Sequence, residues 1–131
     1  WDSILNNQLP VVSSLGVSHQ GLTLNINADY VATKLALEIV ADKLILMTDV
    51  AGVMLDPKDP STLISSLTVS RARELIADGS IGSGMIPKIE SAIRAIESGL
   101  GKIHMINGRV SHSLLLEIFT DHGVGTEIKP D

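Results

Sequence analysis

Three glycines lie just ahead of a lysine in the middle of the chain, and together they could bind a phosphate group. Gly79, Gly82 and Gly84 fall within six residues, and Lys88 follows in the first turn of a predicted helix. Glycines let backbone amides approach an anion, and a helix N-terminus adds partial positive charge. A lysine opposes the helix dipole at this position. We therefore interpret Lys88 as a phosphate-facing cation, with an ordinary solvated lysine as the alternative.

Asp49 follows a short apolar run, residues 43–48, that is typical of a strand buried on both faces of a parallel sheet. In open α/β sheets, ligands bind beyond the carboxyl ends of the strands. The segment Thr48–Gly52 is therefore a second candidate binding segment. Neither a P-loop nor a dinucleotide-binding fingerprint is present, so phosphate binding would depend on these local glycine-containing turns.

A third polar group spans the end of a predicted strand and the start of a predicted helix. It consists of Asn25, Asn27 and Asp29. Asn27 is a good N-cap and Asp29 lies in the first helical turn, so capping and dipole complementarity explain the group from the residues alone.

Other chemistries find no support in the residues. The chain has no cysteine, which excludes thiolate chemistry and fits a reducing compartment. No serine lies in a G-x-S-x-G turn, so a Ser-His-Asp triad is not predicted. The four histidines are not at metal-ligand spacing, and no metal site is predicted from them: His19, His104, His112 and His122.

The composition predicts an ordered globular chain. It has 131 residues, 44% of them hydrophobic, and a formal net charge of −5. Basic residues are scattered, so binding to nucleic acid or an anionic membrane is not expected. No apolar run is long enough for a membrane span. The chain opens at Trp1 in what reads as the end of a helix, residues 1–7, and we expect it to be a piece of a longer protein.

Hydrophobic spacing predicts an α/β fold with a largely parallel sheet between helical layers. Helices are predicted at residues 27–41, from Thr68 or Ser70 to 78, at 86–98, and from a Ser111 cap through Phe119. Strands are predicted at residues 9–15, 22–24, 43–48 and 103–106, and after Gly125, with an exposed loop at 56–60.

Four strings resemble those of the acetylglutamate kinases, and they occur in the same order over nearly the whole chain. The resemblance implies the amino-acid kinase fold, a three-layer α/β sandwich. Residues 1–24 would be the tail of the amino-acid-binding part, and residues 25–131 the nucleotide-binding domain. The strings are Asn25-Ile-Asn-Ala-Asp29, Lys43-Leu-Ile-Leu-Met-Thr-Asp-Val-Ala-Gly52, Gly84-Met-Ile-Pro-Lys88 and Gly108-Arg-Val-Ser-His-Ser-Leu-Leu-Leu-Glu-Ile-Phe-Thr-Asp121.

The resemblance also implies a reaction, the transfer of the γ-phosphoryl group of MgATP to the γ-carboxylate of N-acetylglutamate. Such transfer depends on positioning and charge neutralisation. Lys88 corresponds to the family's transition-state lysine, Asp29 to its organising aspartate and Asn25 to its substrate-contacting asparagine. The nucleotide-binding segments correspond to Thr48, Asp49, Val50, Ala51, Gly52, Val53 and Met54, and to Ser80, Ile81 and Gly82.

The carboxy-terminal part resembles the arginine-inhibited members of the family. His104, Glu117 and Gly123 correspond to positions around the arginine effector, where Glu117 would pair with the cation. From the residues alone, Glu117 reads as a solvated helix residue and His104 as a satisfied strand histidine. The family's amino-terminal phosphate loops, second lysine and substrate-binding arginine have no counterpart here. By itself the chain is therefore expected to bind nucleotide weakly and not to turn over.

Three functions follow as hypotheses. The chain is part of an intact kinase, or a non-catalytic module that responds to nucleotide or arginine, or a surface for the P-II signalling protein, which binds family members in photosynthetic organisms. The resemblance further implies a homo-oligomer in the cytoplasm, or in the plastid of a photosynthetic eukaryote.

Overall fold

The computed structural model describes residues 2–120 and 123–131. Trp1 of the predicted helix end at residues 1–7, Asp121 at the end of the fourth string, and His122 lie outside the described residues. In chain order the elements are α1 (Asp2–Leu5), β1 (Leu15–Val17), β2 (Thr23–Asn25), α2 (Ala28–Glu38), β3 (Leu44–Thr48), the 3-10 helix η1 (Pro60–Thr62), β4 (Ser66–Thr68), α3 (Val69–Ala77), α4 (Ile86–Glu97), β5 (Ile103–Asn107), α5 (Ser113–Phe119) and β6 (Thr126–Lys129).

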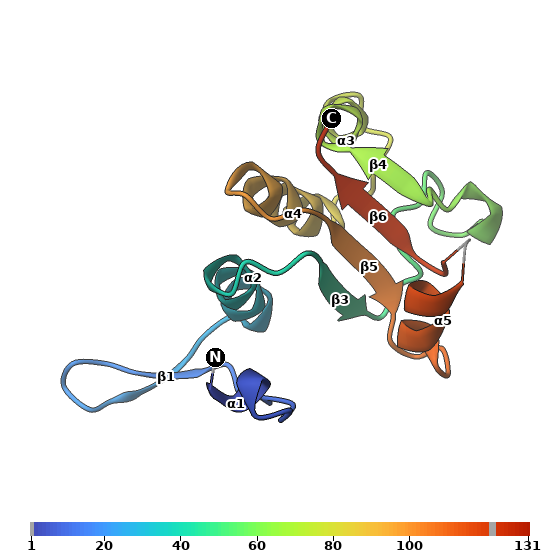
Figure 1. Ribbon diagram of the computed structural model, residues 1–131. Coiled ribbons are helices and arrows are strands. Elements are labelled where there is room, and N and C mark those ends of the chain that lie inside the picture. Colours follow the sequence, from blue (N-terminus) through green and yellow to red (C-terminus); the bar gives the residue numbers. More distant parts are fainter. Residues whose placement is uncertain (1, 121–122) are drawn as a thin grey trace.

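The main sheet has the strand order β3-β5-β6-β4 (Figure 1). β3 runs parallel to β5, with Leu44 opposite Ile103 and Thr48 opposite Asn107. β4 is parallel to β6, whereas β5 and β6 are antiparallel. The predicted largely parallel sheet is confirmed, and β4 is a strand that the apolar pattern did not predict. Because β6 is antiparallel to β5, it begins at the edge where β3 and β5 end.

Helices cover both faces of this sheet. Alternate residues of a strand point to opposite faces, so Ile103 and Met105 of β5 share one face with Ile128 of β6. These residues form a core with buried residues of α2, α3 and α4. His104 points to the opposite face, where it meets Glu117 of α5. The predicted three-layer α/β sandwich is confirmed.

α4 shows how the sequence forms these helices. Ile89, Ile93 and Ile96 recur at helical spacing and are buried, which stabilises the helix on the sheet by about 1.5–3 kcal/mol for each side chain. Pro87 lies in the first turn, where its missing N–H costs no helical hydrogen bond. Gly99, with φ +109°, follows the last turn. The predicted helix at residues 86–98 is confirmed to within one residue.

The amino-terminal prediction of a strand at residues 9–15 is wrong. Strand pairing begins only at Leu15, where β1 and β2 form an antiparallel hairpin. Leu9 and Val11 are 89% and 92% exposed. Their β propensity is not sufficient, because a strand needs a partner for its backbone groups. In Figure 1 this arm, which contains α1 and the hairpin, extends away from the body.

Two helix ends differ from the prediction. α2 ends at Glu38 rather than near residue 41, because Val40 adopts a left-handed conformation with φ +54°. α5 is not capped by Ser111. Its N-cap is His112, which has φ +58° and makes no side-chain cap hydrogen bond. A turn in which the Ser113 N–H donates to the Val110 carbonyl at 3.2 Å delays the helix start.

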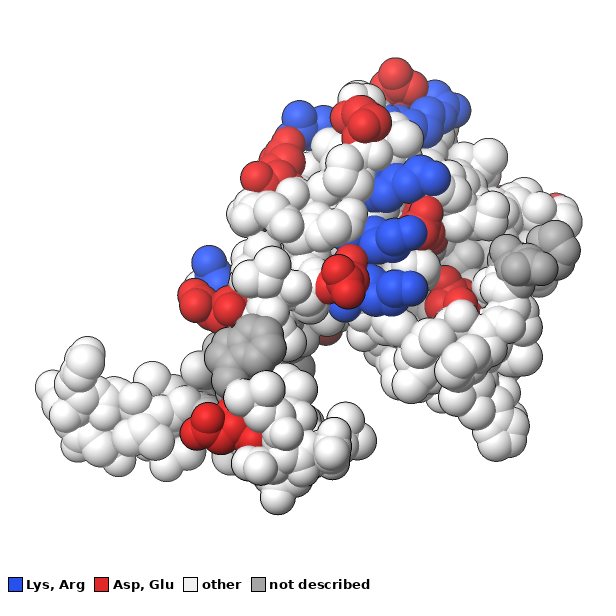
Figure 2. All heavy atoms as spheres, viewed as in Figure 1, with Lys and Arg blue, Asp and Glu red and all other residues white. Residues whose placement is uncertain are grey.

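The surface of the described residues matches the scattered charges of the sequence. Basic and acidic side chains are interleaved over the helical body, and the β1–β2 hairpin carries neither (Figure 2). Within residues 2–120 and 123–131, no helix is both long and apolar enough to cross a membrane.

Candidate functional site

The chain turns sharply where β3 ends, and its own side chain holds the turn. The Thr48 hydroxyl accepts the Val50 N–H at 3.1 Å and donates to the Val50 carbonyl at 2.9 Å. The Thr48 carbonyl also accepts the Gly108 N–H at 2.8 Å, which joins the ends of β3 and β5. Asp49 is left exposed at this edge, 3.9 Å from the Arg109 guanidinium. The ends of β3 and β5 therefore meet at one edge of the sheet.

A cavity of about 390 Å³ lies beside this edge, within the size range of small-molecule sites, roughly 300–1,000 Å³. Three segments form it: the turn after β3, the loop before η1 and the start of α4. Its lining residues are Asp49, Val50, Gly52, Met54, Pro57, Gly82, Ser83, Gly84, Met85 and Lys88. We call it the nucleotide cavity below, because residues predicted to bind a nucleotide are among those that line it.

The glycines of the nucleotide cavity serve different purposes. A Cβ atom on Gly52 would lie 2.5 Å from the Thr126 hydroxyl, and Gly52 has φ +155°, so packing and conformation both require glycine there. A Cβ on Gly82 would only touch Pro57 at 3.9 Å, and one on Gly84 would meet nothing within 4 Å. Gly82 and Gly84 therefore leave room at the mouth of the cavity.

The N-terminus of α4 opens onto the same cavity. Among the described residues, no side chain caps it. The helix dipole places partial positive charge at this end, and half-buried Lys88 adds a full charge in the first turn. Two like charges at one point are unfavourable without an anion, so this arrangement suits a phosphate group.

The structure brings together part of the predicted nucleotide-binding set. Asp49, Val50, Gly52, Met54 and Gly82 line the cavity with Lys88. The other predicted residues support it from behind or lie beside it: Thr48 holds the turn, Val53 and Ile81 are buried in the core, the Ser80 N–H donates to Asp78 at 2.9 Å, and Ala51 does not line the cavity.

Pro57, Ser83 and Met85 also line the cavity and were not predicted. Ser83 and Met85 stand beside Gly84, so their place among the glycines was an available signal. Pro57 comes from a loop 25 positions earlier than Gly82, and only the tertiary fold brings it near.

Asn25 and Asp29 lie elsewhere. Asn25 is the last residue of β2 and Asp29 lies in the first turn of α2; both are exposed, and neither lines the nucleotide cavity. The predicted cap between them is confirmed, because the Asn27 side chain accepts the Tyr30 N–H at 3.0 Å.

The residues of the cavity fit a nucleotide. Val50, Met54 and Met85 give it an apolar wall for a base, while Lys88 and the glycine amides suit phosphates. Asp49 is the carboxylate of the lining. The described residues contain no group of three His, Cys, Asp or Glu that could hold a metal ion. Mg²⁺ commonly binds through one or two carboxylates together with substrate phosphates, so Asp49 is compatible with an ion that enters with the nucleotide.

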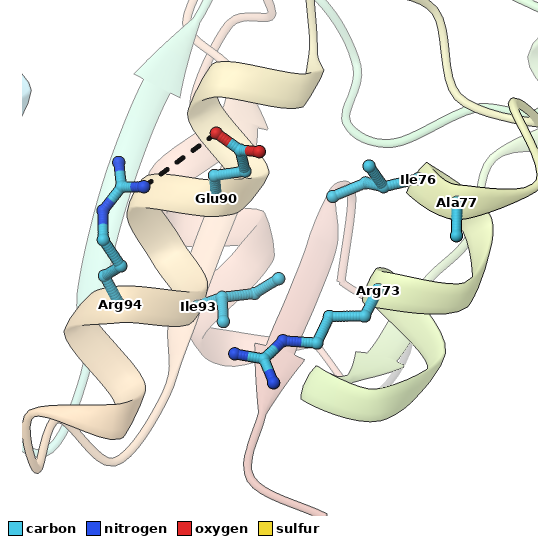
Figure 3. Close-up of a pocket in the computed structure, with 6 residues that line it drawn as sticks. All are labelled: Arg73, Ile76, Ala77, Glu90, Ile93 and Arg94. Atoms are coloured by element: carbon cyan, nitrogen blue, oxygen red, sulfur yellow. Dashed lines mark ion pairs between the residues drawn. The ribbon is translucent and has the colours of Figure 1, made fainter.

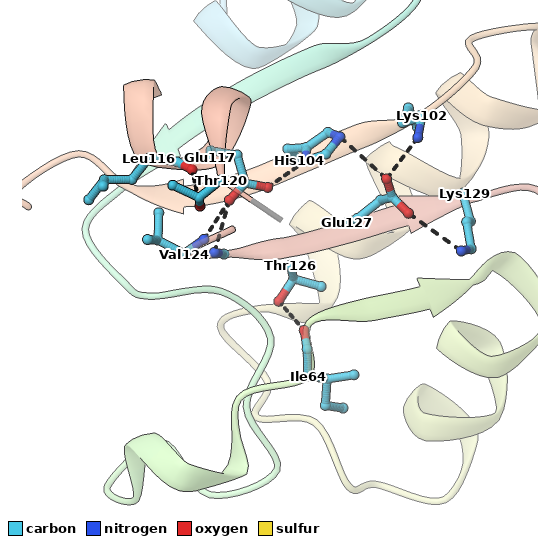
Figure 4. A network of polar contacts seen from close by, with 11 residues as sticks. Ile64, Lys102, His104, Leu116, Glu117, Thr120, Val124, Thr126, Glu127 and Lys129 are labelled. Atoms are coloured by element: carbon cyan, nitrogen blue, oxygen red, sulfur yellow. Dashed lines mark hydrogen bonds and ion pairs between the residues drawn. The ribbon is translucent and has the colours of Figure 1, made fainter. Parts of the chain in front are cut away.

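A second pocket, of about 360 Å³, lies on the face of the sheet opposite the helical core. We call it the carboxylate pocket, because Glu117 and Glu127 bind the His104 ring between them (Figure 4). His104 Nδ1 lies 2.5 Å from Glu117 Oε1, and its Nε2 lies 3.6 Å from Glu127 Oε2. Its full lining is Lys43, Ser65, Ser66, Lys102, His104, Glu117, Thr120, Gly123 and Glu127.

Glu117 also holds the backbone that follows Gly123, at the border of this pocket. Its Oε2 accepts the N–H groups of Val124 at 2.7 Å and Gly125 at 3.2 Å. Gly123 has φ +58°, and a Cβ atom there would lie 2.7 Å from the same oxygen. The structure therefore brings His104, Glu117 and Gly123 together. Glu127 and Lys102, which are 2.9 Å apart, complete the pocket and were not predicted.

Both carboxylates are held in the charged form. Burial is the largest single influence on Glu117 and disfavours its charge, but hydrogen bonds from two backbone N–H groups and from His104 outweigh it. The pKa of Glu117 is consequently lowered from its ordinary value of 4.5. Burial also opposes the charge on Glu127, but the Lys102 ammonium and other nearby cations outweigh it and lower the pKa of Glu127.

A third hollow, of about 290 Å³, lies between α3 and α4 (Figure 3). Ile76 and Ile93 line it with Ala77, and its rim carries Arg73, Arg94 and Glu90. The rim is already paired, because Arg94 lies 3.9 Å from Glu90 and Arg73 lies 2.6 Å from Glu97. We assign no binding role to it.

Comparison with known proteins gives consistent relatives. The model of the Amino acid kinase family matches residues 2–107. An acetylglutamate kinase of Moorella thermoacetica is 54% identical over 127 residues, covering 97% of this chain and 43% of that enzyme. The acetylglutamate kinase of Methanocaldococcus jannaschii is 51% identical over 128 residues, which cover 98% of this chain and 43% of that enzyme. The chain thus spans less than half the length of these curated relatives.

Solved structures show the same fold. N-acetylglutamate synthase from Neisseria gonorrhoeae, complexed with coenzyme A and L-arginine, matches 99% of this chain and 30% of its own with a TM-score of 0.87 and 29% identity. Isopentenyl phosphate kinase from T. acidophilum matches 98% of this chain and 50% of its own, with a TM-score of 0.66 and 20% identity. The second likeness concerns the fold alone.

Proposed function

Because the chain belongs to the amino acid kinase family, we propose that it forms the nucleotide-binding half of a kinase acting on N-acetylglutamate. The reaction is transfer of the γ-phosphoryl group of MgATP to the γ-carboxylate, a step in arginine biosynthesis. The relatives that share about half of its residues are acetylglutamate kinases. The observation that carries the proposal is the nucleotide cavity, in which Lys88, the start of α4 and the strand-end Asp49 surround one space.

Within this proposal, each part of the cavity has a task. The ammonium of Lys88 neutralises charge that develops on the transferring phosphoryl group. The glycine amides and the N-terminus of α4 hold the other phosphates. The apolar wall of Val50, Met54 and Met85 orients the base. Mg²⁺ bound to the phosphates supplies further charge neutralisation, with Asp49 as the carboxylate available to it.

Asn25 and Asp29 belong to the proposed reaction through the family resemblance. Asp29 would organise the catalytic groups and Asn25 would contact N-acetylglutamate. Both are exposed at the junction of the arm and the body, at the end of β2 and the start of α2. Residue 25 also marks the proposed boundary between the amino-acid-binding tail and the nucleotide-binding domain.

Nucleotide titration of the purified chain tests the proposal. Calorimetry with MgATP should give measurable binding, and Lys88→Met should weaken it about 10–100-fold, because hydrogen bonds to charged groups contribute roughly 1.5–3 kcal/mol. Lys34→Met is the matched control, since Lys34 lies over the Tyr30 ring on α2, 5.7 Å from its centroid. Absence of binding by the unmodified chain, or equal affinity in the Lys88 variant, would overturn the proposal.

The carboxylate pocket favours a second role, an effector site for L-arginine. Its Glu117 is 6% exposed and carries a negative charge in a pocket that Gly123 also lines, which suits a guanidinium. The gonococcal synthase, which shares this fold, was solved with L-arginine. We propose that arginine binds here, beside His104, and regulates the enzyme allosterically. Glu117→Gln should abolish arginine binding and leave MgATP binding unchanged. Retained arginine binding together with weakened MgATP binding would contradict the assignment.

The remaining proposals concern the oligomeric state, the protein partner and the cellular compartment. We expect a homo-oligomer in the cytoplasm, or in the plastid of a photosynthetic eukaryote, with the P-II signalling protein as a candidate partner of the carboxy-terminal domain. Light scattering of the purified protein tests the first, and a pull-down with P-II tests the second. If the full-length protein bound nucleotide or arginine but showed no catalytic turnover, the result would favour the hypothesis of a non-catalytic module.

A further inference from the structure

Thr126 is a completely buried side chain at the start of β6, and its hydroxyl joins two segments distant in sequence. Oγ1 accepts the Val53 N–H at 2.8 Å and donates to the Ile64 carbonyl at 2.6 Å, the second contact being drawn in Figure 4. A hydroxyl is the side-chain group that both donates and accepts through one atom. Val53 is fully buried, so its N–H depends on Thr126 for a partner, whereas Ile64 is partly buried.

The residue that Thr126 holds belongs to a wall of the nucleotide cavity. Val53 is itself fully buried, but its neighbours Gly52 and Met54 both line the cavity. Gly52 packs directly on the hydroxyl, since a Cβ atom there would lie 2.5 Å from Thr126 Oγ1. Ile64 is tied back to the same segment, because its N–H donates to the Val53 carbonyl at 2.9 Å. The position of this wall is therefore set from β6.

The opposite side of the same strand start faces the carboxylate pocket. The residue before Thr126, Gly125, donates its N–H to Glu117, and the residue after it, Glu127, is a carboxylate of that pocket. Of three consecutive residues, Gly125 and Glu127 therefore contact the carboxylate pocket, and Thr126 contacts the wall of the nucleotide cavity. Thr126 is the one whose side chain points toward the nucleotide cavity, since alternate residues of a strand face opposite sides.

We infer that Thr126 is a positioning residue for nucleotide binding, which fixes the Gly52–Met54 wall of the cavity through its buried hydroxyl. The inference rests on the proposed nucleotide site and adds a residue that does not itself line the cavity. It does not act on the phosphates. It acts by holding the Val53 backbone where the base-binding side of the cavity needs it.

The test compares Thr126→Ser with Thr126→Val in the full chain, using MgATP titration below the unfolding temperature of every variant. Serine keeps the hydroxyl and should bind within about threefold of the unmodified chain. Valine keeps the shape and loses both hydrogen bonds, and should bind at least tenfold more weakly, because the buried Val53 N–H is left unpaired and the Ile64 carbonyl loses its link to β6. Equal affinity of the two variants overturns the inference.

Two further proteins separate positioning from a general loss of stability. Leu75→Ala removes a buried side chain of α3 that does not line the cavity; it should lower the melting temperature and keep MgATP affinity. Thr126→Cys replaces the hydroxyl with a weak hydrogen-bonding thiol and should bind less tightly than the serine variant, which supplies the test where the valine variant does not fold. Loss of affinity in Leu75→Ala equal to that in Thr126→Val would contradict positioning. If the unmodified chain binds no MgATP, the proposed function fails instead.

Discussion

The nucleotide cavity and the carboxylate pocket lie on the same body but are held in different ways. In the nucleotide cavity, glycines, a strand end and a helix start form much of the wall beside the apolar side chains of Val50, Met54 and Met85. Exposed Asp49 and half-buried Lys88 also line the space. In the carboxylate pocket the side chains are themselves the structure. Glu117 and His104 are 6% and 10% exposed and bind one another across α5 and β5.

This difference has a consequence for how each site responds to substitution. Where backbone forms the wall, a functional side chain can be removed without leaving a buried polar group that lacks a hydrogen-bond partner. Where a buried carboxylate holds a loop and a histidine, its removal leaves buried polar groups unpaired, which is costly. Stability and binding should therefore separate in the first site and coincide in the second.

The largest expected loss of stability comes from Gly52→Ala. The new Cβ atom would lie 2.5 Å from the Thr126 hydroxyl, which two hydrogen bonds hold in place, and Gly52 has φ +155°. We expect the free energy of unfolding to fall by roughly 2–4 kcal/mol in urea denaturation, from overpacking and an unfavourable backbone conformation.

Gly84→Ala is the matched control, since a Cβ atom at Gly84 meets nothing within 4 Å and this glycine also lines the cavity. Its effect on unfolding should stay below about 1 kcal/mol. Similar losses in both variants would show that the wall at Gly52 is not rigid.

Glu117→Gln should have the next largest effect. Glutamine keeps the shape but loses the charge that His104 and the Val124 N–H bind, so we expect a loss of about 1–3 kcal/mol in the free energy of unfolding. Glu97→Gln is the control: Glu97 pairs with Arg73 on the surface and is 47% exposed, so its loss should be below about 1 kcal/mol. If Glu97→Gln lowered the free energy of unfolding as much as Glu117→Gln, the burial of Glu117 would not make its ion pair more stabilising than the exposed one.

The carboxylate pocket should also make stability depend on pH in acid. The pKa values of Glu117 and Glu127 are lowered in the folded chain from 4.5. Their charged forms therefore contribute stability above pH 4.5, and this contribution is lost as the pH falls through the lowered pKa values. One proton taken up changes the free energy of unfolding by about 1.4 kcal/mol per pH unit at most.

Thermal unfolding between pH 3 and 6 measures this dependence. The melting temperature should fall below pH 4.5, and Glu117→Gln should show a shallower fall because one titrating group is gone. Lys88→Met should keep the full slope. A slope unchanged in the Glu117 variant would mean that other carboxylates account for the acid sensitivity.

The fold could be predicted where the signal was local. The apolar spacing of α4, the Asn27 cap of α2 and the positive φ of Gly79 after α3 are properties of neighbouring residues. β4 was missed because its three residues, Ser66–Thr68, contain a single apolar residue, which is too few to establish a strand period. The strand expected at residues 9–15 failed for the opposite reason: its residues favour a strand, but pairing partners are supplied only by the fold.

The same distinction between local and long-range signals applies to the residues of the two sites. Lys88 and its glycines are close in sequence, and Asp49 follows a predicted strand, so each could be identified as a candidate from the sequence. Only the structure shows that they line one cavity. Pro57, Glu127 and Thr126 could not be predicted, because their contacts join segments distant in the chain; the Val53–Thr126 hydrogen bond, for example, spans 73 positions.

The smallest expected effect on stability is that of Lys88→Met, the variant that should lose most nucleotide affinity. Lys88 lies half-buried in the first turn of α4, where a positive charge opposes the helix dipole. Its removal should change the free energy of unfolding by less than about 0.5 kcal/mol, or raise it slightly. Urea denaturation without nucleotide measures this. A loss above 1 kcal/mol would mean that Lys88 holds the cavity together as Glu117 holds its pocket, and the contrast between the two sites would fail.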